Sequence, residues 1–144
     1  MARISTYDPA QVIVTVDGRD IAGFADGTFV NVERNADAFT LAMGSDGEGT
    51  RSKSNDRSGR FTFTLQQSAL GNDILNEIAN ADEQSNQGVV AVQVKDASGN
   101  SLHSAEKAWV VKKATSGYAK ETENREWILE TNELVHDPGS NAEA

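Results

Sequence analysis

Short stretches in which apolar and polar residues alternate dominate this chain, and their period of two limits what it can fold into. Residues 61–65, Phe-Thr-Phe-Thr-Leu, alternate most clearly, as is typical of a β-strand with one buried face. The same tendency marks five further stretches: 12–16, 29–32, 90–94, the run that begins at Trp109, and 126–131. The sequence therefore predicts a mainly β protein of about six strands.

One stretch has a helical spacing instead. Its apolar residues recur at intervals that place them on one helix face: Leu70, Ile74, Leu75 and Ile78. Ser68 is a candidate N-cap, and the region around Gly88 ends the segment. We expect one flanking α-helix, about residues 69–82, that covers apolar surface of a sheet.

Two segments have no period at all. The first, residues 43–58, is rich in Gly, Ser and charged residues. Structureless loops longer than ~12–15 residues in a compact domain are usually functional or disordered. The second, 136–144, is expected to be a flexible tail. The length of 144 residues fits one domain, so we assign 1–144 to a single domain.

Charge is placed unevenly along the chain. The 22 acidic and 13 basic side chains give a net charge of −9, which argues against a protein that grips nucleic acid. Residues 51–70 form an exception with a net charge of +3, because Asp56 is their one acid among four bases. Those bases are Arg51, Lys53, Arg57 and Arg60. An acidic protein thus has one basic patch, in and just after the long loop.

Groups for catalysis or metal binding are scarce. The chain has no Cys and two His, His103 and His136, far apart in sequence, which removes thiol chemistry and most metal-site patterns. No Gly-x-Ser-x-Gly motif occurs. Glu126 and Glu130 would lie about 13–14 Å apart on one strand, wider than a glycosidase pair. We therefore expect no enzyme activity, no catalytic residue, no cofactor and no metal.

The long loop contains two weak motif matches. Gly44 and Gly49 have the separation of a phosphate-binding loop, but Thr50-Arg51 follows where Lys and Ser or Thr are required. Asp46 and Glu48 do not have the spacing of an EF-hand calcium loop. We interpret both as parts of a flexible, solvated loop.

The chain has no apolar run near the ~18 residues of a membrane span, so we expect no membrane anchor. Its N-terminus lacks an apolar signal core, so we expect no cleaved export signal. A small sheet protein without candidate catalytic or metal-binding groups still has open strand edges, which are templates for pairing with another strand. A symmetric assembly would use them, because a head-to-tail contact with a closing rotation forms a ring. A long loop projecting from one rim could then join stacked rings.

A resemblance to a known family is carried by residues 6–9, 12–18, 21–30, 32–34, 37, 44–49, 51, 58–59, 61–65, 68 and 72–75. In these residues the sequence resembles the tail tube proteins of contractile-tailed (myovirus) bacteriophages. The likeness is strong to about residue 80 and looser beyond.

The resemblance implies a tail-tube β-sandwich or β-barrel whose copies form hexameric rings stacked into a tube. Inner strands of six copies would join around a lumen, and the 43–58 loop would reach the adjacent ring. On this reading the inter-ring contact residues are Asp46, Glu48, Arg51, Lys53 and Arg57. Such a tube would sit in the virion tail, assemble in the host bacterial cytoplasm, and meet sheath, baseplate and tail-terminator proteins. DNA would pass through it during ejection without specific binding, and an acidic lumen would favour that passage.

Two alternatives stay open. The tube could belong to a type VI secretion system or a phage-like bacteriocin, which share this fold by the same resemblance. From a different class, the chain could be a monomeric β-sandwich that binds carbohydrate or protein. Such a module normally presents clustered exposed aromatics, for which Tyr7, Tyr118, Phe24 and Phe39 are the candidates.

Overall fold

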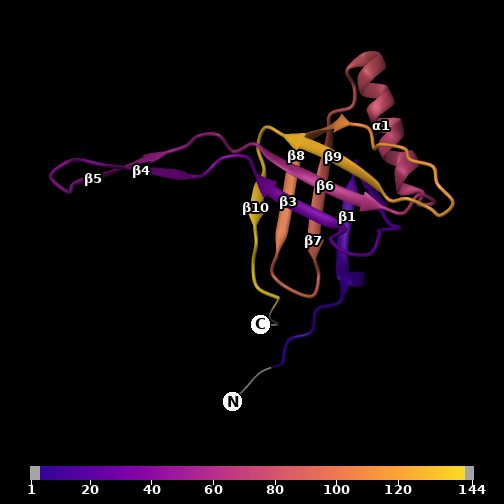
Figure 1. Cartoon of the computed structure of the whole chain (residues 1–144), viewed down its shortest axis with the longest axis horizontal. Helices are drawn as coiled ribbons and strands as arrows, with labels where there is room; N and C mark the ends of the chain where they lie inside the picture. The colour runs from indigo at the N-terminus through magenta and orange to yellow at the C-terminus, as the bar shows by residue number, and fades with distance from the viewer. Residues whose placement is uncertain (1–3, 142–144) are drawn as a thin grey trace.

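Ten β-strands and one α-helix make up the computed structural model, which describes residues 4–141 (Figure 1). A short 3₁₀-helix (Pro9–Gln11) precedes the first strand. In chain order the elements are β1 (Val12–Val16), β2 (Arg19–Ile21), β3 (Val30–Arg34), β4 (Phe39–Met43), β5 (Gly49–Lys53), β6 (Gly59–Leu65), α1 (Gly71–Ser85), β7 (Val90–Asp96), β8 (Leu102–Lys112), β9 (Arg125–Thr131) and β10 (Val135–Asp137). The mainly β class with one helix is confirmed.

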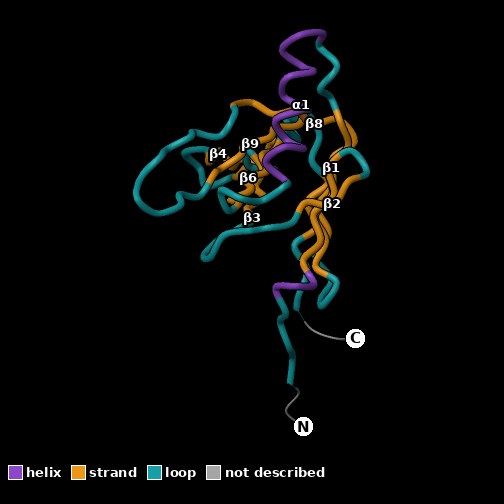
Figure 2. Tube along the Cα trace, turned by 90° about the vertical axis from the view of Figure 1, so that its right-hand side faces the viewer, coloured by secondary structure: helices purple, strands orange, loops and turns teal. Residues whose placement is uncertain are grey.

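Eight of the strands form one antiparallel sheet in the order β2-β1-β7-β8-β9-β6-β3, with β10 also paired to β8. The long strand β8 serves two groups, because β7 and β10 pair with its first half and β9 with its second. Register shifts at Val90/Val92 and Val110/Lys112 are the kind of irregularity that bends a sheet. In Figure 1, β3, β6 and β9 cross β1, β7 and the lower part of β8. The 90° view shows β1 and β2 beside the β3, β6 and β9 group (Figure 2).

The sheet is curved but open. Its two ends, β2 and β3, do not pair with each other among the described residues. The expectation of a closed barrel is therefore wrong for this chain on its own. The physical reason lies in the strand lengths, because β2 has only three residues and offers too short an edge to complete the circle.

The core lies between the two strand groups, and the period of two creates it. Along β6 and β9 every second residue is buried, including Phe61, Phe63, Trp127 and Leu129. From the other group β1 and β7 contribute valines: Val14, Val16, Val92 and Val94. The strands predicted at 12–16, 61–65, 90–94 and 126–131 are all confirmed.

The helix α1 covers the end of this core with Leu75, Ile78 and Ala79. It runs from Gly71 to Ser85, a little later than the predicted 69–82. The N-cap prediction for Ser68 is wrong, since Leu70 occupies that position without a side-chain hydrogen bond. At the other end Asn86 turns left-handed with φ 58° and stops the helix before Gly88.

The predicted count of about six strands is too low. The turn expected at Asp17-Gly18 is present, with φ of 53° and 77°, and it leads into the short β2, which the sequence pattern did not mark. Strand β8 begins at Leu102, seven residues before the predicted start at Trp109. Its first half has few buried positions, so the apolar alternation there is weak.

The segment expected to be a structureless loop, 43–58, is partly a β-hairpin. Strands β4 and β5 pair only with each other, and their hairpin extends far from the rest of the molecule (Figure 1). We call residues 39–53 the arm. Its tip, 44–48, is closed by a hydrogen bond from the Gly44 N–H to the Glu48 carbonyl (2.7 Å). The prediction of an irregular loop is therefore wrong for β5 and holds only for the tip and for residues 54–58.

The tail that we expected to be flexible from residue 136 overlaps β10. Strand β10 pairs with β8, and the next residues approach the turn after β7. There the Asn100 N–H donates to the Ser140 carbonyl (2.9 Å), and the Ser101 hydroxyl donates to the Gly139 carbonyl (3.0 Å). The last three residues of the predicted tail, 142–144, lie outside the described part of the chain.

Candidate functional site

The arm has two chemically different faces. Residues that oppose each other in an antiparallel pair share a face, and the register places Phe39 opposite Lys53 and Leu41 opposite Arg51. Together with Met43 these four side chains form what we call the apolar–basic face. The other face carries only small side chains: Thr40, Ala42, Thr50 and Ser52.

The apolar side chains of this face are open to solvent. Phe39, Leu41 and Met43 are 44%, 69% and 61% exposed. The Arg51 guanidinium carbon lies 4.2 Å from the centre of the Phe39 ring, within cation–π range. Contiguous exposed apolar side chains of this kind mark an interaction surface. The sequence contains a short signal for this strand, because Phe39, Leu41 and Met43 alternate with Thr40 and Ala42, but the polar residues that follow obscure it.

The base of the arm is tied to the sheet by hydrogen bonds. The Asp56 carboxylate accepts from the Ser58 N–H (3.0 Å) and the Ser58 hydroxyl (2.6 Å), and these bonds hold the pKa of Asp56 below its usual value. The Leu134 N–H donates to the Arg57 carbonyl (2.8 Å). The Arg57 side chain lies 3.7 Å from the Glu133 carboxylate, an exposed ion pair.

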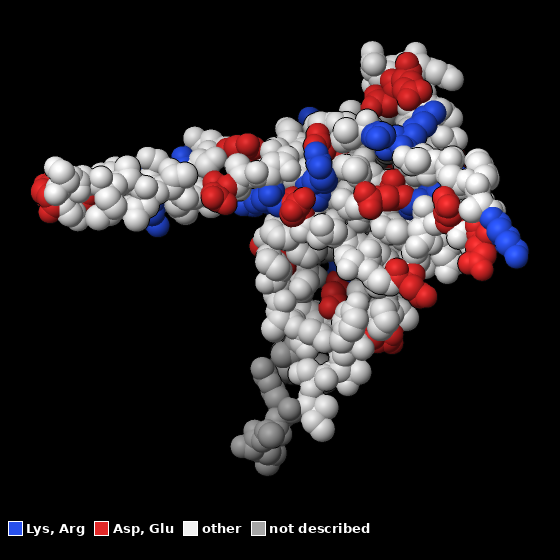
Figure 3. Space-filling view, in the orientation of Figure 1, with Lys and Arg blue, Asp and Glu red and all other residues white. Residues whose placement is uncertain are grey.

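The five predicted contact residues thus fall in three places. Asp46 and Glu48 are at the tip, where the Asp46 carboxylate accepts from the Glu48 N–H (3.2 Å). Arg51 and Lys53 are on β5, and Arg57 is at the base, beside Glu133. In Figure 3 acidic side chains lie at the end of the arm and basic ones gather where the arm joins the sheet.

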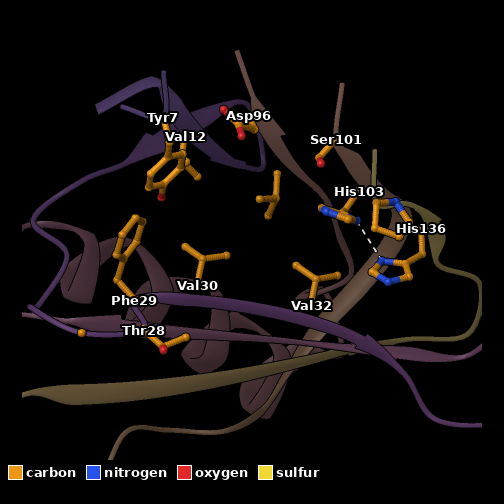
Figure 4. Close-up of a pocket in the computed structure, with 13 residues that line it drawn as sticks. Tyr7, Val12, Thr28, Phe29, Val30, Val32, Asp96, Ser101, His103 and His136 are labelled. Atoms are coloured by element: carbon orange, nitrogen blue, oxygen red, sulfur yellow. Dashed lines mark hydrogen bonds between the residues drawn. The ribbon is translucent and has the colours of Figure 1, made fainter. Parts of the chain in front are cut away.

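A second feature is a groove of about 590 Å³ at the opening between β3 and the β1, β7 and β10 strands. Slightly more than half of its wall is apolar, with side chains from Val12, Phe29, Val30, Val32 and Val94. Figure 4 shows Val30 and Val32 pointing from β3 into the space below Tyr7 and the histidines. Asp96 is the one fully charged residue in the lining. Sequence reasoning missed this groove because its residues come from segments that only the folded sheet brings together.

The two histidines of the chain meet at one end of this groove. They oppose each other across β8 and β10, and their Nδ1 atoms are 2.8 Å apart (Figure 4). Such a contact needs one ring to donate and the other to accept through an unprotonated Nδ1, so the two rings cannot both be protonated. Burial lowers the pKa of both; His136 adds to the effect on His103, and Arg34 adds to the effect on His136. Asp137 acts in the opposite direction on both rings.

This pair predicts a pH dependence of stability. The folded pKa values lie below the unfolded value of about 6.5, so the unfolded chain binds more protons between those values. The contribution of the histidine pair to the free energy of unfolding should therefore be fully present above about pH 6.5. The free energy of unfolding should fall as the pH drops through that value. Urea titrations between pH 8 and pH 5, followed by circular dichroism, measure it.

The control for this prediction is the His103→Phe/His136→Phe variant, which removes both titrating rings but keeps aromatic bulk. Its unfolding free energy should change less over the same pH range. An equal decline in the variant and the wild type would assign the pH dependence to carboxylates.

No other arrangement in the described residues suggests chemistry. Within 4–141 no three His, Asp or Glu side chains converge as metal ligands. Glu130 is engaged by Arg60 at 2.7 Å, in agreement with the interpretation of a charged strand face. Over the same part of the chain no helix is long and apolar enough to cross a membrane.

Comparison with known proteins gives three consistent results. The family model for the bacteriophage PhiTE tail tube protein matches residues 5–136. A structural protein (ORF10) of Pseudomonas phage KPP10 is 29% identical over 147 aligned residues, covering 96% of this chain and 85% of that protein.

Among solved structures, the tube-terminating cap of the anti-feeding prophage superposes with a TM-score of 0.64 at 10% identity, covering 94% of this chain and 93% of the cap. The sheet also matches the sheath–tube complex of an extracellular contractile injection system, with a TM-score of 0.62 at 11% identity, covering 92% of this chain and 91% of that one. At these identities the structures show a shared fold. Since the family model covers most of its length, this chain belongs to the bacteriophage PhiTE tail tube protein family, a family of structural, non-enzymatic phage tail proteins.

Proposed function

We propose that this protein builds the inner tube of a contractile phage tail, as hexameric rings that stack around a DNA-conducting lumen. The observation that carries the proposal is the arm, a two-stranded hairpin that extends away from the sheet of a tail tube family member. An isolated hairpin is marginally stable at best in water. A neighbouring copy that packs against the arm would supply the missing stability.

The charge distribution supports the same proposal. Acidic and basic side chains balance within residues 39–57, so the net charge of −9 belongs to the rest of the chain. An acidic body that surrounds a lumen would repel phosphates and let DNA pass. The basic side chains of the arm would in turn be attracted to the acidic body of the next ring.

The proposal extends to the partners and the place of assembly. The open ends of the sheet, β2 and β3, are edges that neighbouring copies in a ring could use. Sheath, baseplate and tail-terminator proteins would contact the finished tube in the virion tail, after assembly in the host bacterial cytoplasm. The chain would act as one tail-tube domain. A tube of a non-viral contractile injection system is the second candidate, favoured by the fold shared with such a sheath–tube complex.

Charge reversal on the arm tests this proposal. The variant Arg51→Glu/Lys53→Glu/Arg57→Glu replaces the two basic side chains of the arm and the one at its base by glutamates. These would face an acidic neighbour as like charges, which costs several kcal/mol at an interface. We expect the concentration needed for tube formation to rise at least tenfold, while the far-ultraviolet circular dichroism of the subunit stays unchanged. Negative-stain electron microscopy over a concentration series gives the measurement.

A matched control carries the same change in charge elsewhere. Lys107, Lys112 and Lys120 are exposed and lie outside the arm, so the triple Glu variant at these positions should assemble much closer to wild type. Long tubes from the arm variant at wild-type concentrations would contradict the proposal. A wild-type chain that elutes only as a monomer and forms no rings or rods would instead favour the monomeric binding module.

A further inference from the structure

The groove lies beside β3, one of the two open ends of the curved sheet. Among the described residues β3 pairs with β6 and with no other strand. Val30 and Val32 on β3 are only partly buried, and they face Val12 and Val94 across the opening. The lining therefore presents apolar surface that the chain's own sheet leaves unfilled.

The apolar–basic face of the arm has the complementary properties. Its three apolar side chains repeat every second residue from Phe39 to Met43, a length of about 13 Å at the usual strand rise. The part of the groove wall that residues 29–32 form spans about 10 Å at the same rise per residue. Gly49 opposes Met43 in the register, so the far part of this face is narrow and carries no large side chain on β5.

Charge favours the same match. The apolar–basic face carries Arg51 and Lys53, and the one fully charged residue in the lining of the groove is Asp96. The opposite face of the arm has neither apolar bulk nor charge. It would leave the valines uncovered and would bring no cation to Asp96, whose carboxylate accepts from the N–H and the hydroxyl of Ser98 in its own turn. A pairing of the apolar–basic face with the groove places cation near anion and apolar near apolar.

The arm extends sideways from the sheet (Figure 1). No residue of the arm is among those that line the groove of its own chain. We propose that the arm of one copy docks its apolar–basic face into the groove of a second copy. The inference rests on the proposed tube and goes beyond it by naming the face that is buried and the surface that receives it.

Disulfide trapping tests this inference, because the chain has no Cys of its own. Leu41→Cys and Val30→Cys are made in separate chains of different mass, one of them carrying an affinity tag, and are mixed before assembly. Oxidation should give a mixed-mass disulfide dimer on a non-reducing gel. The control pairs Val30→Cys with Thr40→Cys, one residue away on the opposite face of the arm, and should give at least tenfold less.

A second measurement needs no cysteine geometry. Leu41→Ser should raise the concentration for half-maximal tube formation at least tenfold, since Leu41 is exposed in the single chain and the burial of a leucine side chain is worth at least about a tenfold change in affinity. Thr40→Ser should change it less than threefold.

The outcomes separate the inference from the proposed function. Tubes that form without the Leu41–Val30 cross-link, and that tolerate Leu41→Ser as well as Thr40→Ser, would overturn the docking inference and leave the tube proposal standing. A wild-type chain that forms neither rings nor tubes would overturn both.

Discussion

Replacing Asn72 with alanine is expected to lower the free energy of unfolding by about 3 kcal/mol. Asn72 is 5% exposed, and its side-chain oxygen accepts from the Trp127 indole N–H at 2.9 Å. Its amide nitrogen donates to three backbone carbonyls, those of Gln66, Gln67 and Ala69, at 2.8–3.3 Å. One side chain thus fastens the start of α1 to β9 and to the turn that leads into the helix.

The cost arises because the partners of Asn72 stay behind. Alanine would leave the buried indole N–H without an acceptor, and an unsatisfied buried donor costs about 1–3 kcal/mol by itself. Asn72→Asp would keep an acceptor for Trp127 but point a carboxylate at the three carbonyl oxygens, so it should destabilise at least as much. Urea denaturation followed by circular dichroism gives both values.

Asn76→Ala is the matched control, since Asn76 lies on the same helix and is exposed. Alanine has the higher helix propensity, so this variant should be neutral or slightly stabilising. A loss below about 1 kcal/mol for Asn72→Ala would mean that the polar cluster relaxes or admits water and does not fasten the helix to the sheet.

Sequence reasoning located the elements whose periodicity is imposed by burial. Strand β6 and helix α1 each bury one face, so their apolar residues recur at the period of the element. The arm follows another rule. Phe39, Leu41 and Met43 do alternate, but both faces of the hairpin are exposed in the single chain, and the polar tip and β5 conceal the pattern.

The features that depend on tertiary contacts could not be found in this way. His103 and His136 lie 33 positions apart, and only the register of β10 on β8 makes them neighbours. The groove, too, is lined by residues that only the folded sheet brings together. The five predicted contact residues are charged residues of the 43–58 segment that the resemblance places at the inter-ring contact. Arg51 and Lys53 do share a face with the exposed apolar residues, whereas Arg57 is at the base of the arm, paired with Glu133.

Gly23 offers the second large effect, because two independent costs meet at one position. Its φ of +81° lies in the left-handed region, where a residue with a Cβ costs about 1–2 kcal/mol. A Cβ at this position would also lie 2.5 Å from the Cβ of Ala69, an overlap that costs about 1–3 kcal/mol to relieve. Gly23→Ala should therefore lower the free energy of unfolding by about 3 kcal/mol.

A double-mutant cycle separates the two costs. Ala69 lies before the first residue of α1, so Ala69→Gly does not place a glycine inside the helix. In the Gly23→Ala/Ala69→Gly variant the 2.5 Å overlap with the Cβ disappears and a 3.2 Å approach to the Cα of residue 69 remains. Most of the remaining cost should then be that of the backbone conformation. The coupling between the two sites should then be about 1–3 kcal/mol, and strict additivity would show that the close approach of Ala69 is not what excludes alanine at position 23.

The same glycine bears on the groove. The Gln66 N–H donates to the Gly23 carbonyl (2.8 Å), and the Ala25 N–H donates to the Thr64 carbonyl (3.1 Å). Residues 23–25 are therefore hydrogen-bonded to the C-terminal end of β6. Residues 27–29, which line the groove, follow directly. If the groove receives the arm, Gly23→Ala should weaken tube formation by more than its loss of stability alone explains, because the shifted segment changes the shape of the receiving surface. Asn72→Ala is the comparison, because it is expected to be similarly destabilised, while the hydrogen-bond partners of Asn72 (Gln66, Gln67, Ala69 and Trp127) include no residue of the 23–29 segment. Equal assembly defects in the two variants would trace both to stability alone.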